Sequence, residues 1–344
     1  MSTVYVFGAG ASFDAGYPLC SALGSKLLAF MCESINPWIR AAGEFFQDRF
    51  GESPNLEDMI TAIESRIESL KGSSDLSGRT ERGRFANHRG SLAAALREFF
   101  GTIRSERSGS YSIFARSIVR RRDTIVTFNY DDALDRELRS CGIWNVSSGY
   151  GFPFGSEEEP SQVVLLKLHG SVNWLISLFG GAAAGTFLIN PANSMGDAPV
   201  IHRADLRFLG YEEFSGRTYE SGGAPPCLVL PGRTKQFFYD TSMGREFSGF
   251  WESLWSQAEQ ALRDCEKVVI CGYSMPSADA RARELLFENA GNAIPIEIVS
   301  GNDTERIAQG FKSAGFSDVT ESQDRYFSDW VGRLTGGEQR RLLH

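Results

Sequence analysis

Short apolar runs that end in glycine or polar residues recur along this chain, and they predict the strands of a sheet. The runs are rich in β-branched and aromatic residues, and stretches of helical period follow most of them. This alternation predicts an α/β protein with a Rossmann-like, doubly wound, mostly parallel sheet. Strands are expected over residues 2–7, 124–128, 163–168, 227–230, 267–271 and 295–299.

Apolar residues spaced three and four positions apart predict the helices. The clearest stripe contains Leu56, Met59, Ile60 and Ile63, and Asn55 is placed to cap that helix at its start. Helices are expected over residues 23–32, 38–70, 91–103, 111–119, 131–140, 248–264, 277–290, 303–314 and 326–335.

The alternation of strands and helices is interrupted between the first and second strands. Helical patterns fill residues 33–118, so we expect an inserted helical module there and a domain formed by residues 1–32 and 119–344. Within the module, residues 71–90 are polar and rich in glycine, which predicts a mobile loop that covers the pocket. Residues 178–226 show little periodicity and predict short strands or a second cover.

Composition and charge narrow the class of protein. With 344 residues and 42% apolar content the chain can form a globular core, and a net charge of −8 argues against nucleic-acid binding. Neither a secretion signal nor an apolar stretch of the ~20 residues that span a membrane is visible, so we expect a cytoplasmic protein. The cysteines and the four histidines have no zinc-ligand spacing, so we expect no metal and reduced thiols.

Four short motifs follow predicted strands, at the sheet edge where α/β proteins bind ligands. With the last strand residues included, they occupy residues 6–12, 127–131, 167–171 and 271–279. The first is a glycine turn before a helix, which can bring backbone amides close to a phosphate. Phe13 stands where the dehydrogenase fingerprint needs a glycine, so a hydride-transfer enzyme is disfavoured.

Together, these motifs resemble those of the sirtuins, in the same order. Gly8-Ala9-Gly10-x-Ser12 with Gly16-Tyr17-Pro18 resembles the sirtuin phosphate loop, and Thr127–Asp131 resembles the TQNID motif. Leu168–Ser171 resembles the catalytic His-Gly motif. Gly272-Tyr273-Ser274 resembles the late Gly-Thr-Ser strand end, and Gly301-Asn302 resembles the Asn that meets the adenine ribose.

The chain departs from sirtuin deacylases in the interval that holds their four-cysteine zinc module. Only Cys227 and Cys265 lie in that interval. The helical insertion and the variant motif at 272–279 are similar to those of the sirtuin-like proteins of bacterial antiphage defence, which hydrolyse NAD+. In that family the Asn of the second motif and the His of the third are catalytic. The resemblance therefore implies roles for Asn129 and His169.

The function implied is NAD+ hydrolysis to nicotinamide and ADP-ribose, which depletes NAD in abortive infection. Asn129 would hold a ribose hydroxyl or water, His169 would accept a proton, and Asp131 would offset positive charge. The resemblance implies NAD contacts from Gly8, Ala9, Gly10, Ser12, Gly16, Pro18, Thr127, Gly272, Ser274 and Asn302.

Other interpretations of these residues stay open. Asn129 and Asp131 can cap the helix at 131–140, His169 can be a buried core histidine, and Ser274 and Asp279 can serve a turn and a helix cap. The alternative functions are an NAD-dependent protein deacylase, a non-catalytic NAD or ADP-ribose-binding regulatory subunit, and an ADP-ribosyltransferase. Because a constitutive NADase would kill its host, we expect control by homo-oligomerisation, by a separately encoded activating partner protein or by a small signalling nucleotide.

Overall fold

A computed structural model describes residues 2–103, 109–152, 159–177, 205–208, 226–232 and 248–336. The chain forms two compact units. The first contains residues 1–19, 103–171 and 250–344, and the second contains residues 20–102 and 172–249. The module boundaries expected from the sequence, residues 33 and 118, stay a prediction. No helix of the described residues is both long and apolar enough to span a membrane.

The first unit is built on a six-stranded parallel sheet with the strand order β3-β2-β1-β7-β8-β9. Its central strands are almost wholly apolar, and Val6, Val126 and Ile270 are fully buried, as strands covered by helices on both faces must be. The predicted Rossmann-like α/β fold is confirmed. The strands are β1 (Thr3–Phe7), β2 (Thr124–Thr127), β3 (Val164–Lys167), β7 (Lys267–Cys271), β8 (Ile296–Val299) and β9 (Val319–Glu321).

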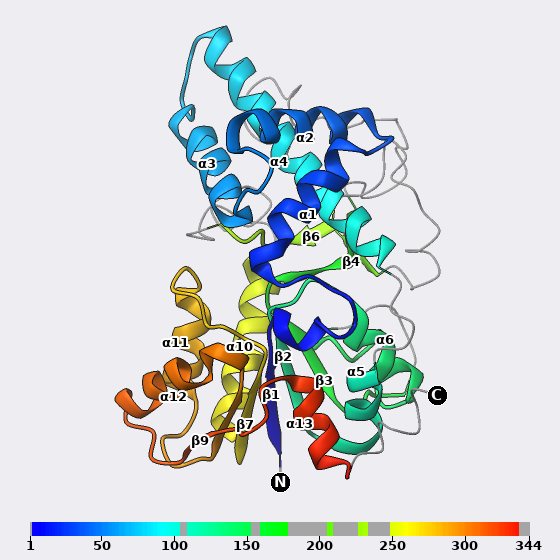
Figure 1. The fold of residues 1–344 in the computed structure, drawn as a ribbon, viewed down its shortest axis with the longest axis vertical. Coiled ribbons are helices and arrows are strands. Elements are labelled where there is room, and N and C mark those ends of the chain that lie inside the picture. The colour runs from blue at the N-terminus through cyan, green and yellow to red at the C-terminus, as the bar shows by residue number, and fades with distance from the viewer. Residues whose placement is uncertain are drawn as a thin grey trace. The chain divides into compact units, whose positions relative to one another are not determined.

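The chain winds outward from the centre of this sheet in two directions. β1, β2 and β3 run toward one edge, and β7, β8 and β9 run toward the other. Right-handed crossovers then place the connecting helices on opposite faces. Figure 1 shows α5 (Gly109–Ile113), α6 (Ala133–Ser140) and α13 (Phe327–Leu334) on one side of the strands, and α11 (Ala280–Asn289) and α12 (Thr304–Ser313) on the other. The winding direction changes between β1 and β7, and ligands bind at such switch points.

The remaining elements of this part of the chain are short, except for one long helix. α10 (Ser248–Asp264) precedes β7, and Trp251 and Trp255 on its apolar face are buried, as the helical period predicts. Short helical turns are η1 (Ala9–Ser12), the π-helical stretch η2 (Phe114–Ile118) and η3 (Gly301–Asp303).

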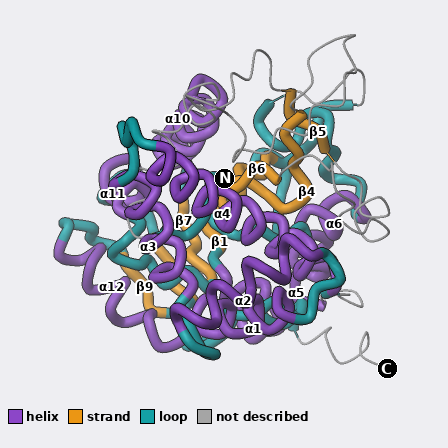
Figure 2. The backbone as a smooth tube through the Cα atoms, turned by 90° about the horizontal axis from the view of Figure 1, so that it is seen from above, coloured by secondary structure: helices purple, strands orange, loops and turns teal. Residues whose placement is uncertain are grey.

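The described part of the second unit contains α1 (Cys20–Cys32), α2 (Pro37–Phe50), α3 (Leu56–Ser69) and α4 (Leu76–Thr102). α1 packs against α2, and α3 packs against α4 (Figures 1 and 2). Asn55 caps α3 as predicted, since its Oδ1 accepts from the backbone N–H groups of Glu57 (2.8 Å) and Asp58 (3.3 Å).

The prediction of a mobile loop over residues 71–90 is wrong, because most of that stretch belongs to α4. Two ion pairs tie its first half to α3, Arg66 with Glu81 at 2.8 Å and Arg89 with Glu64 at 2.9 Å. Phe85 is buried on the same helix. These contacts between distant residues outweigh the low helix propensity of the glycines, which dominates a reading of the local sequence.

A second sheet has the strand order β5-β4-β6. β6 (Pro226–Leu228) overlaps the strand expected at 227–230. β4 (Gly170–Ser177), which pairs antiparallel with β5 (Asp205–Phe208), is not predicted, because its first glycine indicates a turn. Apart from 205–208 and 226, the cover expected over 178–226 lies outside the described residues.

Candidate functional site

The motifs follow a row of paired strand ends at the carboxyl edge of the parallel sheet. Thr127 at the end of β2 pairs with both Lys167 of β3 and Phe7 of β1, and Phe7 also pairs with Cys271 of β7. Cys271 in turn pairs with Val299 of β8. The segments that leave these five strands therefore begin side by side, although they are far apart in sequence.

The glycine turn after β1 is bound tightly to the turn after β7. The N–H of Gly8 donates to Cys271 O (3.1 Å), and that of Gly10 donates to Gly272 O (2.9 Å). A Cβ on Gly8 would lie 2.5 Å from Tyr273 Cα, and Gly272 has a φ of +61°. Close packing at the switch point thus requires these glycines and uses two amides expected to meet phosphate. Their contact with NAD stays a prediction, as does that of the half-exposed Ala9.

Ser12, Asn129 and Asp131 form one buried hydrogen-bonded cluster. Asn129 Nδ2 donates to Gly8 O (2.9 Å) and to Ser12 Oγ (3.0 Å), and Ser12 Oγ donates to Asp131 Oδ2 (2.8 Å). The exposed fractions are 1% for Ser12, 9% for Asn129 and 6% for Asp131. The Tyr111 hydroxyl lies 2.9 Å from Ser12 Oγ, a contact that the sequence does not indicate.

The hydrogen bonds of this cluster show which residue of the motif at 127–131 caps the following helix. Asn129 does not cap the following helix, and the Gly8 carbonyl can accept only from the amide nitrogen, which fixes the orientation of the carboxamide. Because both amide hydrogens are used, Asn129 can offer a ligand only Oδ1, as an acceptor. Asp131 does serve the helix start, since its Oδ1 accepts from the N–H of Ala133 at 3.1 Å.

A buried lysine lies behind Asp131. Lys167 is fully buried, and its Nζ donates to Asp131 O (2.5 Å) and to Asp135 Oδ2 (3.0 Å). Tyr150 donates to the same Asp135 carboxylate. Burial raises the pKa of Asp131, while the positive charge of Lys167 lowers it. The only sequence signal for this pair is a lysine inside an apolar strand.

His169 lies beside a carboxylate from another segment. Its Nε2 is 3.4 Å from Asp279 Oδ2, and the Tyr273 hydroxyl donates to that oxygen at 3.1 Å. Phe128 stacks on Tyr273 with ring centres 4.5 Å apart and lies 5.0 Å from the imidazole. His169 is therefore not a core histidine surrounded only by apolar side chains. Sequence reasoning leaves Asp279 undecided and does not single out Tyr273.

The other predicted NAD-binding residues are more dispersed. The Thr127 hydroxyl donates to Phe7 O (3.3 Å) and accepts from the N–H of Asn129 (3.1 Å), so it supports the sheet edge. Ser274 and Asn302 are exposed after β7 and β8, and each accepts a hydrogen bond from an arginine, Arg306 and Arg325 respectively.

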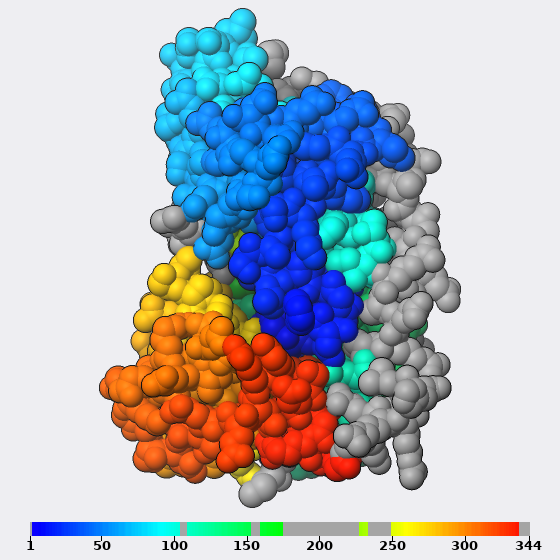
Figure 3. All heavy atoms as spheres, in the orientation of Figure 1, coloured from blue at the N-terminus to red at the C-terminus, as the bar shows by residue number. Residues whose placement is uncertain are grey.

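Gly16 and Pro18 lie in the loop between η1 and α1. Gly16 has a φ of +91°, and Pro18 is buried. Phe13 in the same segment is 59% exposed. In the space-filling view the dark-blue surface of this segment adjoins the red surface of α13 (Figure 3). This segment therefore combines a turn that requires glycine with an exposed aromatic ring directly after Ser12.

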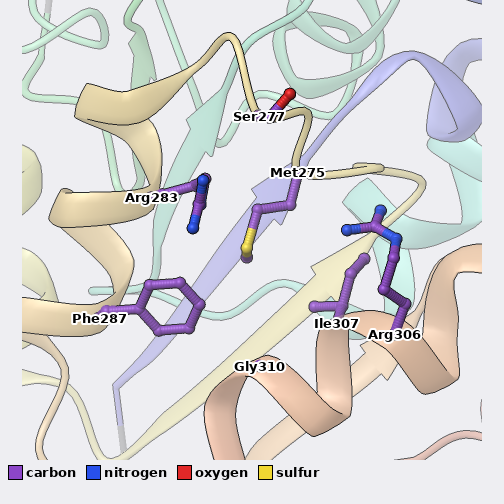
Figure 4. A pocket seen from close by; sticks show the side chains of 7 residues that line it. All are labelled: Met275, Ser277, Arg283, Phe287, Arg306, Ile307 and Gly310. Atoms are coloured by element: carbon purple, nitrogen blue, oxygen red, sulfur yellow. The ribbon is translucent and has the colours of Figure 1, made fainter. Parts of the chain in front are cut away.

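A hollow of about 200 Å³ lies between α11 and α12, next to the turn after β7. Met275, Phe287 and Ile307 supply apolar surface, and Met275 lies between Arg283 and Arg306 (Figure 4). The hollow thus combines apolar surface with two guanidinium groups, a combination that suits a planar apolar group bearing an anion.

No protein-family model matches this chain, and no curated protein matches it. Among the solved structures that are similar to this chain, three are Sir2 proteins. They are a Sir2 enzyme from work on Sir2 mechanism and regulation (TM-score 0.40, 14% identity, covering 99% of this chain and 93% of that one), a Sir2 homologue–NAD complex (0.43, 12%, 100% and 91%), and Sir2Tm bound to a propionylated peptide (0.36, 10%, 98% and 94%). Scores this low carry no conclusion, so the fold assignment rests on the strand order and register.

Proposed function

We propose that this protein hydrolyses NAD+ to nicotinamide and ADP-ribose. The proposal is supported by the positions of Asn129, Asp131 and His169. They follow the ends of the neighbouring strands β2 and β3, beside the switch point between β1 and β7. An acceptor oxygen, a carboxylate and an imidazole are thereby gathered at the edge where α/β sheets bind nucleotides. The order of the motifs, which resembles that of sirtuins, supports NAD+ as the proposed substrate.

The reaction asks for positioning and charge stabilisation more than for a strong acid. The bond between ribose C1′ and the nicotinamide nitrogen breaks, and its electron pair neutralises the cationic ring as it leaves. Asn129 Oδ1 accepts from a ribose hydroxyl or from the attacking water. The water oxygen bonds to C1′ while His169 takes its proton, and the Asp131 carboxylate offsets positive charge on the sugar.

The remaining NAD contacts are proposed along the same edge. The turn at residues 8–12 would face the pyrophosphate, and Ser274 and Asn302 would lie along the adenosine end. The hollow between α11 and α12 adjoins Ser274 and has apolar surface for a base. We propose a role in antiphage defence by NAD depletion, with activity released by self-association or by a separate activating protein.

The test is nicotinamide release from NAD+ by the full-length protein and its Asn129→Ala and His169→Ala variants, in preparations free of other NADases. Loss of the imidazole should slow hydrolysis by about 10²–10⁴-fold, and loss of the amide acceptor by about 10²–10³-fold. Asn289→Ala, a change at the end of α11, is the control that should keep full activity. Full turnover by both site variants contradicts the assignment.

The same assay separates the alternative functions. A deacylase releases nicotinamide only when an acetyl-lysine peptide is added. A regulatory subunit binds NAD+ or ADP-ribose and leaves it intact, which calorimetry and product analysis distinguish. An ADP-ribosyltransferase transfers label from adenylate-labelled NAD+ to a protein. Release of free ADP-ribose without any peptide is the result that hydrolysis requires.

A further inference from the structure

Asp279, which follows β7, lies beside the imidazole of His169 and is bound by Tyr273 from the same segment. Asp279 Oδ2 lies 3.4 Å from His169 Nε2, and the Tyr273 hydroxyl donates to the same oxygen at 3.1 Å. His169 and Tyr273 are each 4% exposed, and Asp279 is 3% exposed. A carboxylate buried this deeply needs hydrogen-bond donors, and an imidazole N–H and a phenol are suitable ones.

Asp279 occupies a helix start without using its side chain there. It is the N-cap residue of α11, and its carbonyl accepts from the N–H of Arg283 at 3.1 Å. Its carboxylate makes no capping hydrogen bond. Aspartate is favoured at this position because its side chain caps, so a carboxylate directed instead toward His169 indicates another use.

The rings around this contact restrict its geometry. Phe128 stacks on Tyr273 at an angle of 25° and packs against His169, and it directly precedes Asn129. Titratable groups near the imidazole among the described residues include Asp279, which Tyr273 binds, and Tyr130 after β2, whose ring centre is 6.3 Å away. The histidine is therefore held from two segments that both carry proposed site residues.

We propose that Asp279 is a positioning residue that keeps the proton of neutral His169 on Nε2, with Tyr273 holding the carboxylate in place. The lone pair then lies on Nδ1, which receives the proton from water while the water oxygen bonds to C1′ and nicotinamide leaves with the electron pair of the broken bond. Asp279 also stabilises the imidazolium that results. This inference rests on the proposed NAD+ hydrolysis.

The kinetic test is Asp279→Asn, which keeps the size of the side chain and allows the wrong tautomer of His169. We expect kcat to fall by about 100-fold or more, with little change in KM for NAD+. The acid limb of the kcat/KM profile should move to lower pH, because the variant lacks the charge that stabilises imidazolium. Tyr273→Phe should change kcat and the acid limb in the same direction but by less. Asp318 is an exposed aspartate before β9, and Asp318→Asn should change neither quantity.

A second measurement does not depend on activity. The chain has only four histidines, so ¹⁵N spectra of histidine-labelled protein can report the tautomer of His169 after assignment with His169→Ala. The wild type should carry the proton on Nε2, and Asp279→Asn should shift it toward Nδ1. The inference is overturned if the wild type carries the proton on Nδ1, or if the tautomer of His169 is unchanged in both Asp279→Asn and Tyr273→Phe. Absence of NAD+ turnover with the expected tautomers overturns only the proposed function.

Discussion

Asp132 is a buried carboxylate whose partners only partly replace water. It is 2% exposed, its Oδ1 lies 3.4 Å from the Arg136 guanidinium, and the Tyr17 hydroxyl donates to it at 3.5 Å. Burial raises its pKa to about 6, against the opposing effect of Arg136. Because the folded pKa lies above the unfolded value, the contribution of Asp132 to stability is most favourable at low pH and is lost as pH rises from about 4 to about 6.

Asp132→Asn should therefore stabilise the protein above about pH 6 and leave it unchanged near pH 4. A pKa that rises from 3.8 to about 6 corresponds to about 3 kcal/mol of unfolding free energy at neutral pH. Urea unfolding at both pH values measures this difference. Asp135→Asn is the matched comparison, since it removes the partner of Lys167 and should destabilise. A variant equally destabilised at both pH values would show that the Arg136 ion pair dominates.

The site residues differ in how far their sequence context specifies them. The glycines at 8, 10 and 272 are visible in sequence, but their cause is a contact between two turns more than 250 residues apart. From the local sequence, both Asn129 and Asp131 can either cap the next helix or belong to the site. Only the hydrogen bond from Asn129 to Gly8 O, a contact between distant residues, distinguishes the two. Asp279 is undecided for the same reason, because capping is a local interaction and the contact with His169 is not.

At the scale of elements, the first half of α4 is held to α3 by two ion pairs that differ in burial. In the Arg89–Glu64 pair the side chains are 20% and 8% exposed, and burial raises the pKa of Glu64. In the Arg66–Glu81 pair they are 42% and 31% exposed.

Arg89→Met should destabilise the protein more than Arg66→Met, although both changes remove one arginine from the same pair of helices. The first leaves a buried carboxylate without its charge partner, which costs about 3–5 kcal/mol. The second breaks a solvated pair worth less than about 1 kcal/mol. Thermal and urea unfolding of the two variants measure the difference. Equal destabilisation would indicate that packing of the arginine stems, and not burial of Glu64, determines the cost.

At the scale of the whole molecule, the sequence predicts the kind of sheet, and the boundaries of the inserted helical module stay a prediction. The apolar runs correctly predict five strands of the parallel sheet, because buried parallel strands are apolar throughout. β9 is missed because it is three residues long and largely exposed. No local pattern encodes the grouping of residues 20–102 with residues 172–249, in which β6 contacts α4.

The cysteines of this chain bear on zinc binding, since a sirtuin zinc module needs thiolates gathered at one place. Burial raises the pKa of Cys227 to about 12, that of Cys265 to about 11, and that of Cys271 well above its usual value. The described residues contain no group of three or more His, Cys, Asp or Glu side chains that could hold a metal ion. Buried protonated thiols are inert core residues, and zinc binds thiolates. Elemental analysis should therefore find no stoichiometric zinc, and a chelator should leave the thermal unfolding midpoint unchanged. About one zinc atom per chain, with unfolding on chelation, would favour the deacylase alternative over NAD+ hydrolysis.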